Sequence, residues 1–118
     1  MKNKSITFET ISREQIKDYC QASGDWNKIH WDESFAKEAG LPSIIAHGML
    51  SMGLAARALA ELGYDIDSLQ NFDSKFKDKA LPGDILTAEI ISEGPKELQL
   101  SIKNQKGDEI LTASCSFK

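Results

Sequence analysis

The fold is decided by one apolar stretch, Ile44-Ile45-Ala46-His47-Gly48-Met49-Leu50-Ser51-Met52-Gly53-Leu54-Ala55-Ala56-Arg57-Ala58-Leu59-Ala60-Glu61-Leu62. Its only formal charges are on Arg57 and Glu61. A helix with so little charge has to be covered by the rest of the protein on most of its sides. Its length of roughly 15 residues is too short to cross a bilayer. We therefore expect a buried helix wrapped by a sheet, which can approach closely at the small residues Gly53, Ala55, Ala56 and Ala58.

Four strand candidates follow this helix, at residues 72–77, 85–91, 98–103 and 109–117. The turn signals between them are Leu81-Pro82-Gly83-Asp84, Gly94-Pro95 and Asn104-Gln105-Lys106-Gly107-Asp108. Successive strands that are joined by short turns pair in antiparallel fashion. This half of the chain therefore predicts one antiparallel sheet.

The residues before the apolar helix predict a strand and two shorter helices. Residues 5–11 alternate as a first strand, and Ser12 with Gln15 forms a capping-box signature for a helix that stops at Gly24. Asp32 can cap a short second helix, which Gly40-Leu41-Pro42 ends. The resulting order, β-α-α-α then β-β-β-β, predicts an α+β domain with one sheet packed on one long helix. We expect residues 1–118 to form this single domain.

Composition excludes several classes of protein. The chain has 118 residues, of which 27% are charged, and a formal net charge of -4, which is unlike a basic nucleic-acid surface. Met1-Lys2-Asn3-Lys4 lacks the apolar region of a secretory signal, so a cytoplasmic location is expected. Cys20 and Cys115 have no redox or zinc spacing and are expected to be buried free thiols.

The chemistry-bearing residues begin with the loop Gly24-Asp25-Trp26-Asn27-Lys28-Ile29-His30. It places a carboxylate and an imidazole five residues apart, after a helix, where both can converge on one small molecule or one water. The alternative is structural, with Asp25 or Asn27 capping a turn and His30 packed as a satisfied side chain. A metal site built from His30, His47, Asp25 and Asp32 is a third interpretation, but these residues lack a recognised ligand spacing.

A second element is Ile45-Ala46-His47-Gly48-Met49-Leu50, where the apolar helix begins. The first amides of a helix have no partner within it and carry the positive end of its dipole, so they can bind developing negative charge. Gly48 leaves its amide unobstructed, although a glycine also permits close packing against the sheet. For His47 the residues favour a local hydrogen bond.

Both elements resemble a known family. Ser23-Gly24-Asp25-Trp26-Asn27-Lys28-Ile29-His30-Trp31-Asp32 resembles the hydratase 2 motif of the MaoC-like dehydratases and (R)-specific enoyl-CoA hydratases. Ile45-Ala46-His47-Gly48-Met49-Leu50-Ser51-Met52-Gly53 is similar to the (3R)-hydroxyacyl-carrier-protein dehydratases of actinobacteria, particularly the catalytic subunit of their heterodimers. One departure is Lys28, where the family usually has proline.

The resemblance implies a hot-dog fold, a sheet curled around a central helix, in a dimer or higher oligomer with the acyl chain near the interface. It implies a hydro-lyase acting on trans-2-enoyl or (3R)-hydroxyacyl thioesters, with neither a metal nor a cofactor. Asp25 and His30 would hold the water, and the Gly48 amide would face the thioester carbonyl. Asn27, His47 and Met49 are assigned to substrate binding, with Asn27 bracing the loop.

Two alternatives remain open from the sequence. A hot-dog thioesterase would normally have a carboxylate near the start of the central helix, and the chain has none between Met49 and Ala56. A non-catalytic acyl-thioester binding subunit would lack the acid-base pair. The carrier, CoA or acyl carrier protein, is also open; Lys75, Lys77 and Lys79 could contact an acidic carrier, although alternating lysines favour a solvated strand face.

Overall fold

The computed structural model describes residues 4–118. Residues 1–3, which contribute to the expected absence of a signal sequence, lie outside the described residues. The helices and strands follow one another as β1 (Ser5–Thr7), α1 (Arg13–Ser23), the 3-10 helix η1 (Lys28–His30), α2 (Glu33–Glu38), α3 (Gly48–Glu61), the 3-10 helix η2 (Ile66–Ser68), β2 (Leu69–Phe76), β3 (Thr87–Glu93), β4 (Glu97–Lys103) and β5 (Glu109–Phe117). The predicted α+β class and the order of the long elements are confirmed.

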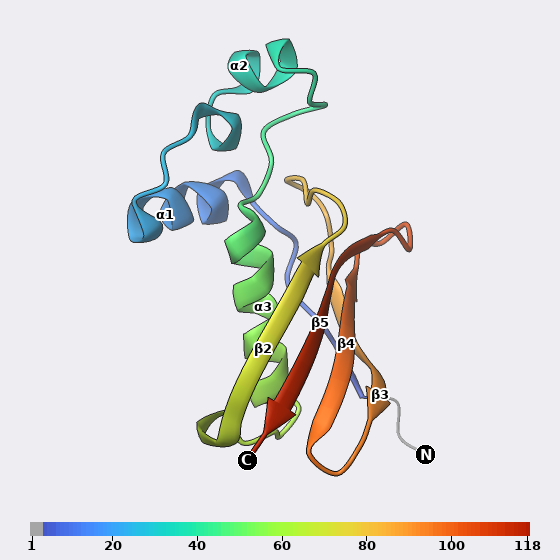
Figure 1. Ribbon diagram of the computed structural model, residues 1–118. Helices are drawn as coiled ribbons and strands as arrows, with labels where there is room; N and C mark the ends of the chain where they lie inside the picture. Colours follow the sequence, from blue (N-terminus) through green and yellow to red (C-terminus); the bar gives the residue numbers. More distant parts are fainter. Residues whose placement is uncertain (1–3) are drawn as a thin grey trace.

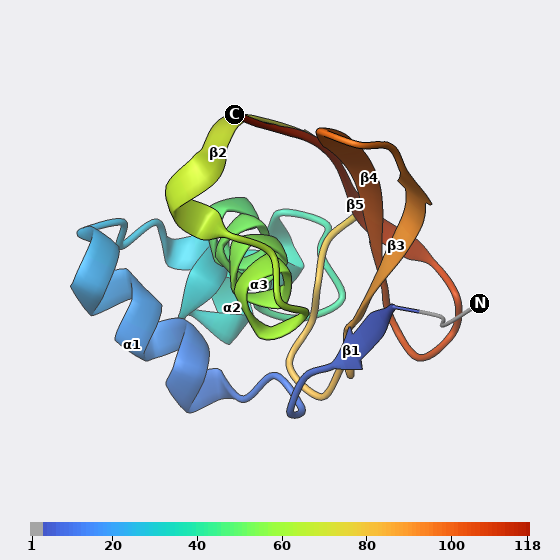
Figure 2. The ribbon, with the colours of Figure 1, turned by 90° about the horizontal axis from the view of Figure 1, so that it is seen from below.

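The strands form one five-stranded antiparallel sheet in the order β1-β3-β4-β5-β2. The sheet curls around α3, with α1 on the side of α3 that the sheet leaves open (Figure 2). In Figure 1, α2 and the loop beside it lie beyond the N-terminal end of α3. The prediction of a sheet wrapped around an apolar helix is confirmed.

The prediction that each strand pairs with the next one along the chain is wrong for β2 and β3. β2 pairs with β5 at one edge of the sheet, so the chain must pass β5 and β4 before it forms β3. The Leu81-to-Asp84 turn exists but is not a hairpin, because β2 and β3 are not neighbours in the sheet. Its Gly83 amide instead donates to the Ile11 carbonyl at 2.7 Å, and Gly83 has a φ of 93°.

The first strand is shorter than predicted. β1 pairs with β3 only from Ser5 to Thr7. Beyond it, the amides of Phe8 and Ile11 donate to the carbonyls of Leu86 and Asp84, which precede β3, so the chain leaves the regular ladder. The predicted helix caps are confirmed at Ser12 and Asp32, whose side chains accept hydrogen bonds from the amides of Gln15 and Phe35.

The core lies between α3 and the concave face of the sheet. The buried residues of α3 are Ser51, Leu54, Ala55, Ala58 and Leu59. Gly53 does not provide the predicted close approach, because no atom lies within 4 Å of the position that a Cβ would take there. Met49 is 56% exposed, so one side of the first turn of α3 is not covered by this chain.

Both cysteines are buried free thiols, as predicted. Burial raises the pKa of Cys115 to about 11, so this thiol is neutral near pH 7. Among residues 4–118, every helix is too short or too polar to cross a membrane. The cytoplasmic location and the single-domain assignment stay predictions.

Candidate active site

The polar loop between α1 and α2 is shaped by its own side chains. α1 ends at Gly24, which has a φ of 77° and closes the helix in the left-handed conformation. Asp25 Oδ1 accepts a hydrogen bond from the Asn27 amide at 3.2 Å, and Asn27 Oδ1 accepts one from the Ile29 amide at 3.2 Å. These two turns wind the chain into η1, which ends at His30. Asp25 and Asn27 therefore have the turn-forming roles that the sequence left open.

The orientation of the His30 ring is set by a main-chain carbonyl. Nδ1 of His30 lies 2.8 Å from the Ile45 carbonyl oxygen. A carbonyl oxygen can only accept, so Nδ1 carries the hydrogen and, in the neutral ring, Nε2 has a bare lone pair. The Ile45 amide in turn donates to the Ile29 carbonyl at 3.1 Å. The loop is thus bound on both sides of His30 to the segment that leads into α3.

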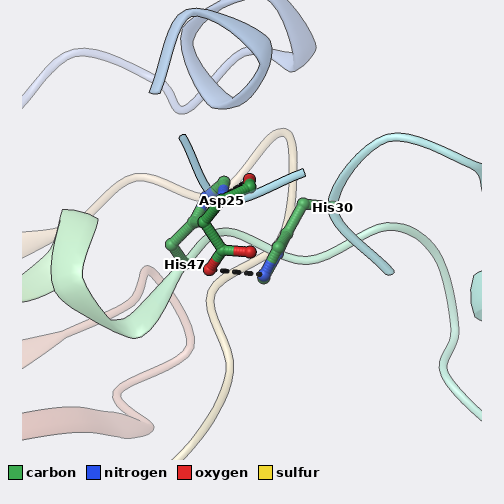
Figure 3. A group of neighbouring side chains, drawn as sticks. All are labelled: Asp25, His30 and His47. Atoms are coloured by element: carbon green, nitrogen blue, oxygen red, sulfur yellow. Dashed lines mark hydrogen bonds and ion pairs between the residues drawn. The ribbon is translucent and has the colours of Figure 1, made fainter. Parts of the chain in front are cut away.

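Asp25 and His30 face each other at a distance that one bridging water can span. Asp25 Oδ2 lies 4.0 Å from His30 Nε2, as the lower dashed line in Figure 3 shows. With a neutral His30 both atoms are acceptors, and 4.0 Å is too long for a direct hydrogen bond. The His30 side chain is 8% exposed and the Asp25 side chain is 54% exposed. One water, which has two hydrogens, can therefore donate to both atoms and be reached from the Asp25 side.

His47 joins this pair from the end of the segment before α3. Its ring stacks on the His30 ring with centroids 3.6 Å apart and planes inclined by 20°. Its Nε2 lies 3.1 Å from the Asp25 carbonyl oxygen, so Nε2 carries a hydrogen and donates. Burial is the largest cause that lowers the pKa of His47 from its ordinary value, and the neighbouring His30 lowers it further.

Gly48 is the first residue of α3, directly after His47. His47 is extended, with φ of -64° and ψ of 140°, and its side chain makes no capping hydrogen bond. The hydrogen bonds of the described residues include none that the Gly48 amide donates. This amide lies at the positive end of a 14-residue helix and can stabilise an anion.

An open cleft of about 340 Å³ is lined in part by Gly48. Its lining includes Gly48, Ser51 and Phe76, the last residue of β2. The Phe76 ring is so near Gly48 that a Cβ there would lie 3.1 Å from Phe76 Cε1. Gly48 therefore lets the Phe76 ring pack closely against the helix and also leaves its own amide accessible, so both interpretations from the sequence apply. The exposed Met49 lies next to it in the chain.

The metal interpretation can be tested on the donor atoms. Asp25, His30 and His47 offer one ligand atom each within 4.8 Å of one another, whereas Asp32 accepts the Phe35 amide and caps α2. His30 Nδ1 and His47 Nε2 are both held by carbonyl oxygens. Because the two rings are stacked with their planes inclined by only 20°, their nitrogen lone pairs lie in nearly parallel planes, an arrangement poorly suited to binding one ion together. The donor set therefore fits a metal poorly.

The sequence missed two groups that shape this site. The Ile45 carbonyl fixes the His30 tautomer, but a main-chain group leaves no signal in residue type. Cys20 was treated only as a buried thiol, and its Sγ lies 3.6 Å from His47 Nε2. The position of Cys20 in the last turns of α1, close before the loop, was the available signal.

The backbone around Lys28 is suited to the family's proline. Asn27 is extended, with ψ of 129°, and Lys28 is the first residue of η1, where a missing amide hydrogen is tolerated. We expect Lys28→Pro to unfold with a free energy about 0.4–1 kcal/mol higher than Lys28→Ala, because the ring restricts the unfolded chain. Lys28→Ala is the matched control, since both variants lose the contact of the lysine with the Phe35 ring. Urea denaturation measures the difference, and a less stable proline variant would contradict it.

Comparison with known proteins points in one direction. A family model described as "MaoC like domain" matches residues 2–114. The chain is 35% identical over 74 residues to the peroxisomal enoyl-CoA hydratase 2 of Arabidopsis thaliana, which covers 61% of this chain and 24% of that protein. The chain spans 4%, 26% and 24% of the length of three curated relatives that it matches.

Solved structures agree in fold. The MaoC-like dehydratase from Phytophthora capsici superposes with a TM-score of 0.86 at 28% identity, covering 97% of this chain and 39% of that one. The (R)-hydratase from A. caviae involved in PHA biosynthesis superposes with a TM-score of 0.82 at 23% identity, covering 97% of this chain and 91% of that one. The expected hot-dog fold is therefore confirmed.

Proposed function

Because the chain belongs to the MaoC-like domain family, we propose that it is a hydro-lyase for the reversible hydration of trans-2-enoyl thioesters to (3R)-hydroxyacyl thioesters. The observation that carries the proposal is the 4.0 Å gap between Asp25 Oδ2 and His30 Nε2. This gap lies beside the N-terminus of α3, since His47 donates a hydrogen bond to the Asp25 carbonyl and directly precedes Gly48. The closer relation to actinobacterial carrier-protein dehydratases stays a prediction.

The proposed reaction places one water between the two side chains. In hydration, Asp25 takes one proton from the water while the water oxygen adds to the β-carbon, and the bare His30 Nε2 orients the water by accepting its second hydrogen. The proton on Asp25 then passes through the new hydroxyl to His30 Nε2 and from there to the α-carbon. Both side chains return to their starting protonation states, so the net change is the addition of one water. A positioned acid or base of this kind contributes about 10²- to 10⁴-fold to the rate.

The Gly48 amide has a separate part in the proposed reaction. Adding hydroxide at the β-carbon of an enoyl thioester transfers negative charge to the carbonyl oxygen. A preorganised donor at that oxygen contributes roughly 3–4 kcal/mol to lowering the barrier. The unpartnered position at the start of α3 supplies such a donor without reorganisation. Asn27 contributes by holding the loop rather than by touching the reacting atoms.

We propose that a second copy of the chain completes the acyl pocket in a homodimer. β2 is an edge strand of eight residues, and such an edge can pair with another chain. Met49 and Phe76, beside the Gly48 amide, are 56% and 53% exposed, and an acyl chain needs them covered. Light scattering is expected to give twice the 13.1 kDa mass of the chain, and a monomeric but active enzyme would contradict this.

Incubation with crotonyl-CoA tests the proposed activity. We expect loss of the enoyl absorbance without release of free thiol, which is hydration. Release of thiol would indicate the thioesterase, and neither change, with binding intact, would indicate the non-catalytic subunit. Among the described residues, α3 has no carboxylate before Glu61, which favours hydration over hydrolysis.

The carrier is tested by pairing crotonyl-CoA with crotonyl acyl carrier protein in the same assay. Of the three lysines considered for an acidic carrier, Lys77 and Lys79 line the cleft beside Gly48, whereas Lys75 lies outside it. Lys79 is already paired with Asp78 at 3.5 Å. We therefore propose CoA or acyl carrier protein thioesters as the substrate class, with the carrier decided by this comparison.

A further inference from the structure

The His47 ring is almost wholly enclosed by the residues of the site. It is 3% exposed and lies against the rings of His30 and Tyr19, with centroid distances of 3.6 and 4.8 Å. Its Nε2 is 3.1 Å from the Asp25 carbonyl oxygen and 3.6 Å from Cys20 Sγ. Such a ring contacts the Asp25 main chain and the His30 side chain, while it has almost no surface left for a substrate.

The hydrogen bond to Asp25 acts on the main chain rather than on the carboxylate. The Asp25 carbonyl lies in the turn whose next hydrogen bond runs from the Asn27 amide to Asp25 Oδ1. A donor that fixes this peptide therefore also fixes the carboxylate. In that orientation Oδ2 of Asp25 faces His30. Without the His47 donor, a half-exposed Asp25 would sample other orientations.

The stacking acts on His30. With the rings 3.6 Å apart and nearly parallel, the His47 face prevents the His30 ring from tilting out of the plane in which Nε2 faces Asp25. A neutral ring also stabilises a neighbouring imidazolium, whereas a charged one would repel it. Burial lowers the pKa of His47, and the groups facing it are Asp25, His30, Tyr19 and the thiol of Cys20, whose pKa burial raises.

We propose that His47 is a positioning residue for the hydration, which holds the Asp25 peptide by one hydrogen bond and the His30 ring by stacking, and does not contact the substrate. The inference rests on the proposed hydratase function and replaces the substrate-binding role that the sequence suggested for His47. His47 also precedes the Gly48 amide directly. One residue thus links the carboxylate, the imidazole and the main-chain donor.

Two substitutions separate the two contacts. His47→Gln retains an N–H donor for the Asp25 carbonyl and removes the ring, whereas His47→Phe retains a ring for His30 and removes the donor. We expect each to lower kcat for crotonyl-CoA by about 10- to 100-fold while KM stays within threefold, because misplaced groups slow chemistry more than binding. Leu59→Ala is the control for stability alone, since Leu59 is buried in α3 roughly 16 Å along the helix from Gly48.

Nitrogen-15 NMR of the imidazoles gives a second measurement that does not depend on activity. In the wild-type chain we expect His30 to carry its hydrogen on Nδ1, and His47 on Nε2. His47→Gln is expected to give a mixture of His30 tautomers, which Leu59→Ala leaves unchanged. The wild-type tautomers and the His30–His47 contact can be measured even if the variants do not fold or the wild type hydrates no enoyl thioester. These two measurements test whether His47 holds Asp25 and His30 as proposed.

Three results would overturn the proposal. A kcat within twofold of wild type in both His47 variants would show that neither contact matters. A raised KM with unchanged kcat would assign His47 to substrate binding. A wild-type His47 with its hydrogen on Nδ1 would remove the bond to Asp25.

Discussion

His30→Ala is expected to lower kcat for the hydration of crotonyl-CoA by about 10²- to 10⁴-fold, because it removes the imidazole nitrogen that faces Asp25 Oδ2 across the 4.0 Å gap. KM should change much less, since the ring is buried and the thioester carbonyl is proposed to contact the Gly48 amide. Loss of enoyl absorbance at saturating substrate measures kcat directly. The dimer is expected to survive, because β2 is untouched.

Asp25→Asn is expected to reduce kcat over the same range of about 10²- to 10⁴-fold. Asparagine can still accept the hydrogen bond from the Asn27 amide, so the turn is retained while the base is lost. Asp32→Asn is the matched control, since it makes the same chemical change at the α2 cap, where asparagine also accepts the Phe35 amide. We expect Asp32→Asn to stay within twofold of wild type. Near-normal turnover in Asp25→Asn or His30→Ala would refute the assigned pair.

Gly48→Pro tests the main-chain donor without removing a side chain. Proline has no amide hydrogen, and it is tolerated at the first position of a helix. The preceding His47, with ψ of 140°, has the extended conformation that a following proline requires. We expect kcat to fall about 10²- to 10³-fold relative to Gly48→Ala, the loss that follows removal of one oxyanion donor.

Gly48→Ala is the control because it keeps the amide and introduces the same Cβ. That carbon would lie 3.1 Å from Phe76 Cε1, so both variants introduce the same Cβ contact with the Phe76 ring. Adding Phe76→Ala to each variant relieves the contact, and the difference between proline and alanine should persist. If Gly48→Pro and Gly48→Ala had equal kcat values, both with and without Phe76→Ala, the Gly48 amide would not face the developing charge. Circular dichroism checks that α3 still forms.

The local features of the site were predictable because they depend on residues close in sequence. Ser12, Gly24 and Asp32 bound the helices around the loop, as their capping chemistry indicates. The turn bonds of Asp25 and Asn27 span two residues each. Residue type and spacing were therefore sufficient to locate the loop and to propose which side chains meet there, although not what they do.

The long-range features were not predictable in the same way. The position of β2 at the sheet edge depends on its pairing with β5, and the connection that follows β2 is bonded through Gly83 to the Ile11 carbonyl, far away in the chain. The His30 tautomer depends likewise on the Ile45 carbonyl, which any residue type could provide. The stacking of His30 on His47 needs both the loop and the start of α3 in place, and neither local pattern contains that information.

The β2–β3 connection has a role in assembling the site as well as in ordering the strands. Its Ala80 carbonyl accepts the amide of Ala46 at 2.8 Å, immediately before His47. The loop and the start of α3 are thus anchored to a part of the chain that is synthesised later and closes only when distant strands have paired. An excised peptide spanning the motif would consequently lack the restraint that orients its groups, and the reactive arrangement is a property of the completed tertiary structure.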